Sequence, residues 1–403
     1  MIAAKRPDSH RSWTRLDGVD VLRGLAIFFV LMNHVNMRLR SESVPYTDGV
    51  PGQLVSTLVW NGQRGVQIFF AISGFLITST SIRRWGSLAK VGTRDFYLLR
   101  FTRIAPLLLA LLAILSFLDS VHLRYFVISP KTGGLGRALI AALTFHINVL
   151  EANRGYLPGN WDILWSLSVE ELFYLLFPLL CALVRRNKLL IAILSTFVVI
   201  GPFGRTVLTH GNPVSQEYSY LGGMDAIALG CLTAVLVSRT ALSRPMLWTF
   251  AASGTALLIL CLCFSNRVAS LGLRRNGLDM TMVAAGTCML VAVAAQTHWT
   301  GSPFIRPLLR LGQRSYEVYL THMFVVFAFF QLFLAAGKPL GAVPALFIAV
   351  ILTSGFLGEA VAHFYSEPMN RFLRSPWGDG PSRLGSVVEG ANEQKRVENR
   401  IAV

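Results

Sequence analysis

About ten stretches of this sequence are long and apolar enough to cross a lipid bilayer as helices. A spanning helix needs about 20 mostly apolar residues, because it rises about 1.5 Å per residue through a hydrocarbon core about 30 Å thick. The composition agrees, since apolar residues make up 53% of the chain and charged residues only 14%. We therefore expect an all-α polytopic membrane protein, and an ordinary soluble enzyme or a disordered chain is excluded. The expected spans are residues 18–37, 65–82, 104–120, 163–184, 189–204, 221–238, 246–264, 279–296, 315–335 and 343–366.

The distribution of lysine and arginine orients these spans. With ten spans and both termini cytoplasmic, about two thirds of the 37 basic residues lie in cytoplasmic segments, as the positive-inside rule requires. Residues 137–150 form a shorter apolar stretch that is either a further span or a re-entrant segment, and a full span there would place the basic tail outside. We expect a cytoplasmic segment over residues 1–17, a membrane domain over residues 18–373 and a disordered cytoplasmic tail over residues 374–403.

The net charge of +16 reflects the same bias. In a soluble protein this charge would suggest nucleic-acid binding, but no soluble basic module is visible, so no nucleic-acid partner is expected. The five cysteines all lie within apolar runs, where cysteine acts as a small buried hydrophobe. Because the sequence has neither a Cys-x-x-Cys pair nor two histidines four positions apart, no metal site is expected.

The first span carries ionisable residues that a bilayer normally excludes. Arg23 and His34 are eleven positions apart, so they share one helix face at an axial separation of about 16 Å. Asp20 precedes Arg23 by one turn. Because a charge within a span is costly, such residues suggest a function. The simpler alternatives are an Asp20–Arg23 pair at the membrane interface and a packing histidine with an internal hydrogen bond.

The span that begins near residue 163 carries two adjacent carboxylates, Glu170 and Glu171. Ser166, Glu170 and Tyr174 are four positions apart and share one face of the helix. In the predicted topology Glu170 lies at about the same depth below the outer surface as His34, so the two side chains can meet.

The second and ninth spans add further polar groups. Ser73 followed by Gly74 is more typical of close helix packing than of a nucleophile, because no base lies beside it in the sequence. Ser315, Tyr319 and His322 are spaced i, i+4 and i+7, which again places them on one face. The simpler alternatives are a helix cap for the Ser315 hydroxyl and a structural role for His322.

The segment between the second and third spans is strongly basic. Residues 83–103 contain six lysines and arginines, among them Arg100 and Arg103. Topology and anionic headgroups account for at least part of this charge. The functional alternative is a docking patch for a polyphosphate ligand, because arginine binds phosphate through two parallel hydrogen bonds.

These clusters together resemble the acyltransferase 3 family, integral membrane acyltransferases that modify bacterial surface sugars and some small molecules. The resemblance covers residues 16–373. It implies ten spans in the bacterial cytoplasmic (inner) membrane. Arg23 and His34 match the family's Arg-x10-His motif, whose histidine is regarded as essential. The matching motifs are Asp20-x-x-Arg23-Gly24, Gly65-Val66 with Ser73-Gly74-Phe75, Arg100-x-x-Arg103-Ile104-x-Pro106, Trp165-Ser166-Leu167-Ser168-Val169-Glu170-Glu171 with Tyr174, Ser315-Tyr316 with Tyr319 and His322, and Glu367-Pro368.

Two features depart from the family pattern. Members often carry an arginine just before the aspartate that matches Asp225, whereas this sequence has Gly222-Gly223-Met224 there, which puts a ligand role for that span in doubt. Some members carry a fused extracytoplasmic esterase-like domain that this sequence does not show. Either a separate extracytoplasmic transferase does that work, or the reaction needs no second step.

The resemblance predicts O-acylation of a hydroxyl on a surface polysaccharide or its lipid-linked precursor. Acyl-CoA, with acetyl preferred, is the expected donor substrate, and no permanently bound cofactor is expected. We assign His34 as general base, Glu170 as the group that orients it, and Tyr319 and His322 as donors to the oxyanion. An acyl-histidine intermediate is the competing mechanism. The residues expected to bind the CoA phosphates are Arg23, Arg100 and Arg103. The expected supporting residues are Asp20, Ser73, Trp165, Ser166, Glu171 and Ser315.

The alternative from another functional class is a transporter or flippase for a sugar or lipid-linked substrate. Embedded histidine, arginine and glutamate also build proton relays in carriers. Carriers often show inverted repeats and broken helices, and neither is evident in this sequence.

Overall fold

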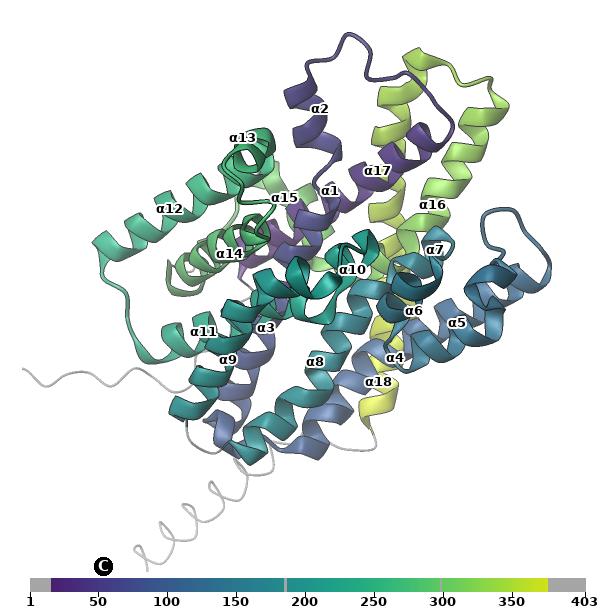
Figure 1. Ribbon diagram of the computed structural model, residues 1–403. Coiled ribbons are helices and arrows are strands. Elements are labelled where there is room, and N and C mark those ends of the chain that lie inside the picture. Colours follow the sequence, from purple (N-terminus) through teal and green to yellow (C-terminus); the bar gives the residue numbers. More distant parts are fainter. Residues whose placement is uncertain (1–15, 185–186, 298, 376–403) are drawn as a thin grey trace, which may run out of the picture.

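The computed structural model describes residues 16–184, 187–297 and 299–375, and these residues form a bundle of helices without a strand (Figure 1). Ten helical segments within them are long and apolar enough to cross a membrane, which confirms the predicted all-α polytopic class. The predicted terminal segments, 1–17 and 374–403, fall almost entirely outside the described residues. The first helices are α1 (Asp17–Ser41), α2 (Gly52–Val59), α3 (Gly62–Trp85), α4 (Thr93–Ser120), α5 (Gly134–Leu143), α6 (Ile147–Arg154), α7 (Gly159–Asp162), α8 (Leu164–Leu183) and α9 (Asn187–Arg205). The remaining helices are α10 (Pro213–Tyr218), α11 (Tyr220–Arg239), α12 (Arg244–Cys263), α13 (Ser265–Ser270), α14 (Leu278–Thr297), α15 (Arg306–Gln313), α16 (Ser315–Ala335), α17 (Val343–Val361) and α18 (Glu367–Arg374).

The apolar stretch at residues 137–150 is not one continuous helix. It is divided between α5 and α6, which are 10 and 8 residues long. Phe145 between them has a φ angle of +57°, a left-handed conformation that ends a helix. Neither helix reaches the length of a span, so residues 121–162 connect α4 to α8 through short helices only.

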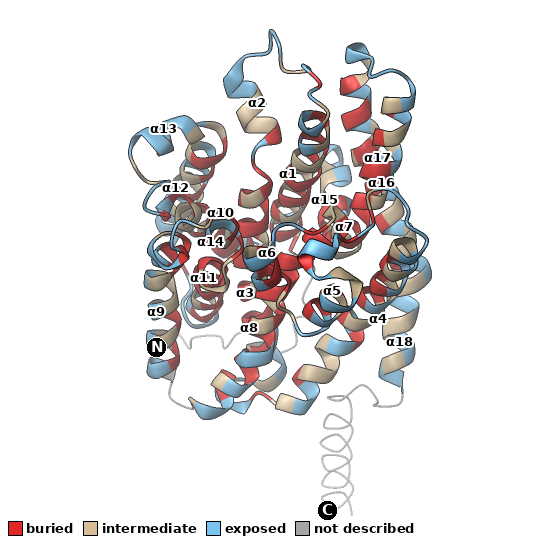
Figure 2. Cartoon of the chain, turned by 45° about the vertical axis from the view of Figure 1, so that its right-hand side comes forward, coloured by how far each residue is buried: buried red, intermediate tan, exposed pale blue. Residues whose placement is uncertain are grey.

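The helices differ in how deeply they lie within the bundle. In the most apolar window of α2–α3, 72% of the residues are buried, compared with 22% for α12. Figure 2 shows the same contrast, with buried residues concentrated where α1, α3 and α16 meet and exposed residues on the outer faces. The apolar outer faces are those that a lipid bilayer would cover.

Glycines bring the central helices into close contact. A Cβ atom on Gly74 of α3 would lie 1.9 Å from the carbonyl oxygen of Ile227, and one on Gly230 of α11 would lie 2.0 Å from that of Ala71. The two helices therefore approach each other through reciprocal glycines, as small residues permit in membranes. The predicted packing interpretation of Ser73-Gly74 is confirmed for the glycine.

A buried ionic cluster joins α9, α11 and α14. Asp225 is fully buried and accepts two hydrogen bonds from the Arg205 guanidinium, at 2.9 and 2.7 Å. Gln67 and Thr281 also donate to its carboxylate, at 3.0 and 2.6 Å. Family members often carry an arginine just before this aspartate, and here Arg205 of α9 supplies the cation instead. The Asp225 carboxylate is therefore paired within the fold.

Two tyrosine hydroxyls form hydrogen bonds to the backbone of α4 around Pro106. Tyr316 of α16 donates to the carbonyl oxygen of Ile104 at 2.8 Å, and Tyr365 donates to that of Pro106 at 3.1 Å. These bonds fix the first half of α4, which carries Arg100 and Arg103, against α16 and against the π-helical segment 362–366 that follows α17.

Candidate active site

A cavity of about 420 Å³ lies between α1, α3, α4, α8 and α16. Its apolar wall comes mainly from α3 and α4. One of its ends lies where α3 ends and α4 begins, and there it is rimmed by arginines. The arginines that line it are Arg23, Arg84, Arg100, Arg103 and Arg374. Of the predicted site and supporting residues, the cavity is lined by Arg23, Ser73, Arg100, Arg103, Ser166, Glu170, Glu171, Ser315 and Tyr319.

The basic rim brings together arginines that are far apart in the sequence. All three predicted phosphate-binding residues contribute to it, one from α1 and two from α4. The Arg100 guanidinium lies over the ring of Tyr174, 4.0 Å from its centroid, which orients the side chain along the wall. Arg23 pairs with Asp20 at 3.8 Å, as the spacing predicted. Arg84 belongs to the basic segment 83–103, for which the sequence suggested a phosphate-docking patch. Arg374 was not predicted, because it lies at the end of α18 and has the sequence character of an ordinary interfacial charge.

Glu170 projects into the wall of the cavity between two hydroxyl groups. The Ser73 hydroxyl of α3 and the Tyr174 hydroxyl one turn along α8 both donate to its Oε1 atom. No hydrogen bond joins Glu170 to His34 among the described residues, so the predicted orienting contact is wrong. Glu170 and His34 lie on helices whose packing turns these two side chains toward different neighbours.

Glu171 is buried, and its Oε1 atom has no hydrogen-bond partner among the described residues. It lines the same cavity from α8. A buried carboxyl oxygen without a partner is costly, so this position favours a ligand or water that donates to it.

The two predicted histidines form a pair. His34 Nδ1 lies 3.0 Å from His322 Nε2, with the ring centroids 4.9 Å apart. His322 Nδ1 faces the carbonyl oxygens of Tyr319 at 2.6 Å and Val318 at 3.2 Å. His322 is fully buried, whereas His34 is half-buried.

This arrangement fixes the tautomers of both rings. Carbonyl oxygens only accept hydrogen bonds, so Nδ1 of His322 carries a proton. The Nε2 atom of a neutral His322 then accepts, and His34 donates to it from Nδ1. The Nε2 atom of His34 is therefore left with a lone pair, as a general base or nucleophile requires. In this tautomer His322 has no proton left for an oxyanion, contrary to the role predicted from its spacing.

Tyr319 lies between the cavity and the histidine pair. Its hydroxyl contacts Ser166 Oγ at 2.7 Å and donates to the carbonyl oxygen of Ile163 at 2.9 Å. Ser315, at the start of α16, lies four residues earlier and also lines the cavity. The helix is preceded directly by Arg314 and has no side-chain cap, so the capping interpretation of Ser315 is wrong.

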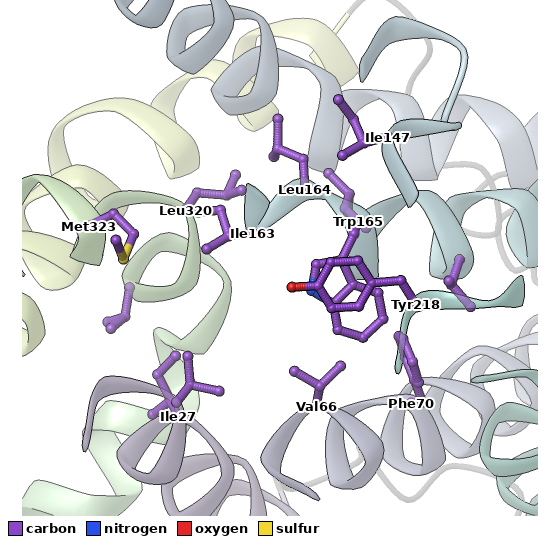
Figure 3. Close-up of a cluster of buried hydrophobic side chains, with 14 of the residues drawn as sticks. Ile27, Val66, Phe70, Ile147, Ile163, Leu164, Trp165, Tyr218, Leu320 and Met323 are labelled. Carbon is purple, nitrogen blue, oxygen red and sulfur yellow. The ribbon is translucent and has the colours of Figure 1, made fainter. Parts of the chain in front are cut away.

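Aromatic packing holds the start of α8 in place. The rings of Trp165 and Tyr218 stack with centroids 4.2 Å apart, and Phe70 meets Trp165 edge-on (Figure 3). Ser166 and Glu170 lie on the helix that this stack holds. Glu367, which matched the family pattern, instead forms an ion pair with Arg314 that joins the start of α16 to α18.

The comparisons with known proteins agree with this geometry. A family model described as "Acyltransferase domain" matches residues 16–358. The chain is 26% identical over 393 residues to "O-acetyltransferase OatA" of Staphylococcus aureus (strain NCTC 8325 / PS 47), covering 91% of this chain and 59% of that protein. It is 26% identical over 324 residues to "Peptidoglycan O-acetyltransferase OatA" of Listeria monocytogenes serovar 1/2a, covering 75% of this chain and 48% of that protein.

The chain spans about half to three fifths of the length of these curated relatives. No solved structure matches it. The family match nevertheless covers nine of the ten candidate spanning segments of the described residues completely, the first part of the tenth, and every residue that lines the cavity except Arg374. This chain belongs to the acyltransferase 3 family of membrane proteins.

Proposed function

We propose that this protein is a membrane O-acyltransferase that moves an acetyl group from acetyl-CoA to a hydroxyl of a cell-wall polysaccharide or its lipid-linked precursor. The observation that carries the proposal is one cavity that begins at an arginine rim and reaches Tyr319, one helical turn from His322, whose hydrogen-bond partner His34 has a free ring nitrogen. The printed names of the relatives, which describe peptidoglycan O-acetyltransfer, support the acceptor class.

The donor occupies the cavity with its phosphates at the rim. Arg23, Arg100 and Arg103 bind them through charge-assisted hydrogen bonds, which are stronger than neutral ones. The thioester arm extends along the apolar wall toward Tyr319. We place the rim on the cytoplasmic face of the bacterial inner membrane, where CoA is available, and both termini on the same face, in agreement with the distribution of basic residues.

His34 acts as the general base in the transfer. Its Nε2 takes the proton of the acceptor hydroxyl while the oxygen attacks the thioester carbonyl carbon. The C–S bond then breaks, and the CoA thiolate leaves and takes up a proton. A positioned base contributes about 10²–10⁴-fold to such a step. The same lone pair supports the competing route, in which His34 attacks first and forms an acyl-histidine.

The remaining polar groups of the cavity act on the donor. Glu170, held by Ser73 and Tyr174, fixes the polar side of the wall, and Glu171 offers an unpaired oxygen to the amide groups of the CoA arm. Tyr319 lines the cavity, and its carbonyl oxygen contacts His322 Nδ1. It donates to the thioester oxygen once the donor displaces its contact with Ile163.

The test compares purified wild-type protein with the His34→Ala and His34→Gln variants at equal amounts in lipid nanodiscs. Labelled acetyl-CoA is supplied with a peptidoglycan oligosaccharide, and label in the sugar is measured. We expect transfer by the wild type and at least 10²-fold less by both variants. Equal transfer by all three would refute the assignment of His34.

The same preparations separate the enzyme from the transporter alternative. In sealed vesicles, a carrier would move a labelled sugar across the membrane without acylating it, and the His34 variants would change that movement. Acetylated product in open nanodiscs, where no compartments exist, supports the enzyme. Vesicle transport without any acetylated product would refute the proposed function.

A further inference from the structure

We propose that Arg38, Tyr125 and Asp162 form the acceptor site, a binding site for a hydroxylated sugar ring on the side of the histidine pair away from the donor cavity. This inference rests on the proposed function. None of the three residues lines the donor cavity. Each of them alone has the sequence character of an interfacial polar residue.

Arg38 places a cation one helical turn beyond His34. The two residues are four positions apart in α1, so they share one face of the helix. The Arg38 guanidinium lies over the ring of Phe327 at 5.4 Å from the centroid, and its Nε atom is buried without a hydrogen-bond partner among the described residues. Asp162 attracts it electrostatically.

Tyr125 packs against the same phenylalanine ring. Its side chain stacks on Phe327 with the centroids 5.1 Å apart and the planes within 5° of parallel. Its hydroxyl oxygen is buried and has no partner in the described part of the chain. Its φ angle is +73°, a strained conformation for an aromatic residue. Such strain persists only where the surroundings impose it and is frequent at ligand sites.

Asp162 supplies a carboxylate that two neighbouring side chains hold in place. Tyr218 donates to its Oδ1 atom at 2.9 Å. Glu151, which is completely buried, interacts with it from α6. Burial, and then the charge of Asp162, raise the pKa of Glu151, so this side chain keeps its proton and donates to the aspartate. The Asp162 carboxyl group is thus held by the Tyr218 hydroxyl and by a neutral acid.

A further unpaired group lies two positions before Asp162 in the chain. Asn160, 1% exposed, has neither its amide nitrogen nor its amide oxygen paired among the described residues. Buried polar atoms are almost always paired, so a cluster of unpaired ones indicates a missing partner.

The missing partner must both donate and accept hydrogen bonds. The set combines a guanidinium donor, a phenol, a carboxylate and a primary amide, and adjacent hydroxyls of a sugar satisfy such a mixture. An anionic lipid headgroup fits less well, because the acidic side chains of Asp162 and Glu151 lie at this site. Tyr125 lies on the loop between α4 and α5, and we expect the entering sugar to lift its ring from Phe327. The bound hydroxyl then lies next to His34.

The experiment measures binding and transfer separately. Binding of a fluorescent peptidoglycan oligosaccharide is compared for wild type, Arg38→Gln, Asp162→Asn and Tyr125→Phe, and the acceptor and donor KM values are measured on the same samples. We expect the sugar Kd and the acceptor KM to rise about tenfold or more in the charge variants, and less in Tyr125→Phe, while the donor KM stays within about twofold.

Matched controls come from the same surface. Arg40→Gln removes an equal charge from an exposed arginine of α1 that stacks on Trp60, and Tyr156→Phe removes a hydroxyl from an exposed tyrosine. Both should bind sugar as the wild type does. Unchanged sugar binding in the three site variants would overturn the proposal and leave buried water as the partner. A parallel loss of donor affinity would also overturn it, because it would indicate a general structural effect.

The His34→Ala variant separates the two proposals. It should bind the oligosaccharide with wild-type affinity while transferring no acetyl group. If the site variants bind the sugar more weakly but the wild type transfers no acetyl group, the proposed function is refuted and the sugar site is kept. Acetyl transfer by the wild type, together with an acceptor KM that is unchanged in all three site variants, would keep the proposed function and refute the sugar site.

Discussion

Replacing His322 tests whether the histidine pair sets the tautomer of His34. Phenylalanine at this position would fill a similar volume but cannot accept the hydrogen bond that His34 Nδ1 donates across 3.0 Å. Glutamine can accept that bond through its amide oxygen while its amide nitrogen donates to the carbonyl oxygen of Tyr319, as His322 Nδ1 does at 2.6 Å. The two variants therefore differ in the one property that the structure assigns to His322.

The expected loss follows from two separate effects. Loss of one neutral hydrogen bond costs about 0.5–1.5 kcal/mol, which corresponds to roughly tenfold or less in rate. Loss of control over the His34 tautomer costs more, because a wrong tautomer of the catalytic histidine lowers kcat about 10⁴-fold in serine proteases. We expect kcat of His322→Phe to fall by about 10²–10⁴ at unchanged donor and acceptor KM, and His322→Gln to recover much of it.

The assay is steady-state acetyl transfer from labelled acetyl-CoA, with each variant at equal concentration and with matched thermal stability. A rise in both KM values of the His322 variants, together with a lower melting temperature, would indicate that His322 has only a packing role. Equal losses in the phenylalanine and glutamine variants would refute the tautomer argument, because the hydrogen-bond geometry would then not distinguish them.

Three further predictions follow from the buried charges. Arg205→Ala leaves the buried carboxylate of Asp225 without its cation, so we expect about 3–5 kcal/mol less stability in a thermal or denaturant unfolding measurement. Arg100→Gln should raise the donor KM about tenfold with little effect on kcat, whereas Lys90→Gln, in the same basic segment but away from the cavity, should change neither. Burial raises the pKa of Glu151 above its unfolded value of about 4.3, so the folded state binds this proton more tightly; its stability is greatest below that pH and falls as the pH rises through neutral. Glu151→Gln should flatten this fall in a pH series of melting temperatures, and a steeper fall in the variant would contradict the assignment.

The spans could be predicted because they depend on local properties of the chain. The length of an apolar run against the bilayer thickness is readable from the sequence, and so are residues that share a helix face. The Ser166–Glu170–Tyr174 face is an example, since Tyr174 donates to Glu170 one turn away.

The contacts between helices could not be predicted in the same way. Depth along the membrane normal does not say which way a helix is rotated, and α8 turns Glu170 toward Ser73 instead of His34. The His34–His322 pair joins residues 288 positions apart, and only the packing of α1 against α16 brings them together. Burial of unpaired atoms at Tyr125 has no sequence signal at all, because the loop that carries it has no periodicity.

The arrangement of charges explains why donor and acceptor would approach the histidine pair from opposite sides. A charged group at the centre of a bilayer costs at least about 2.5–3.5 kcal/mol, so a donor with several phosphates gains by leaving them at the arginine rim. Its acyl thioester is neutral and can enter the largely apolar cavity at little cost. A sugar bound at Arg38 and Asp162 likewise keeps its hydroxyls among polar groups. Only the acyl group, which is the smallest and least polar part of either substrate, then has to pass Tyr319 and His34.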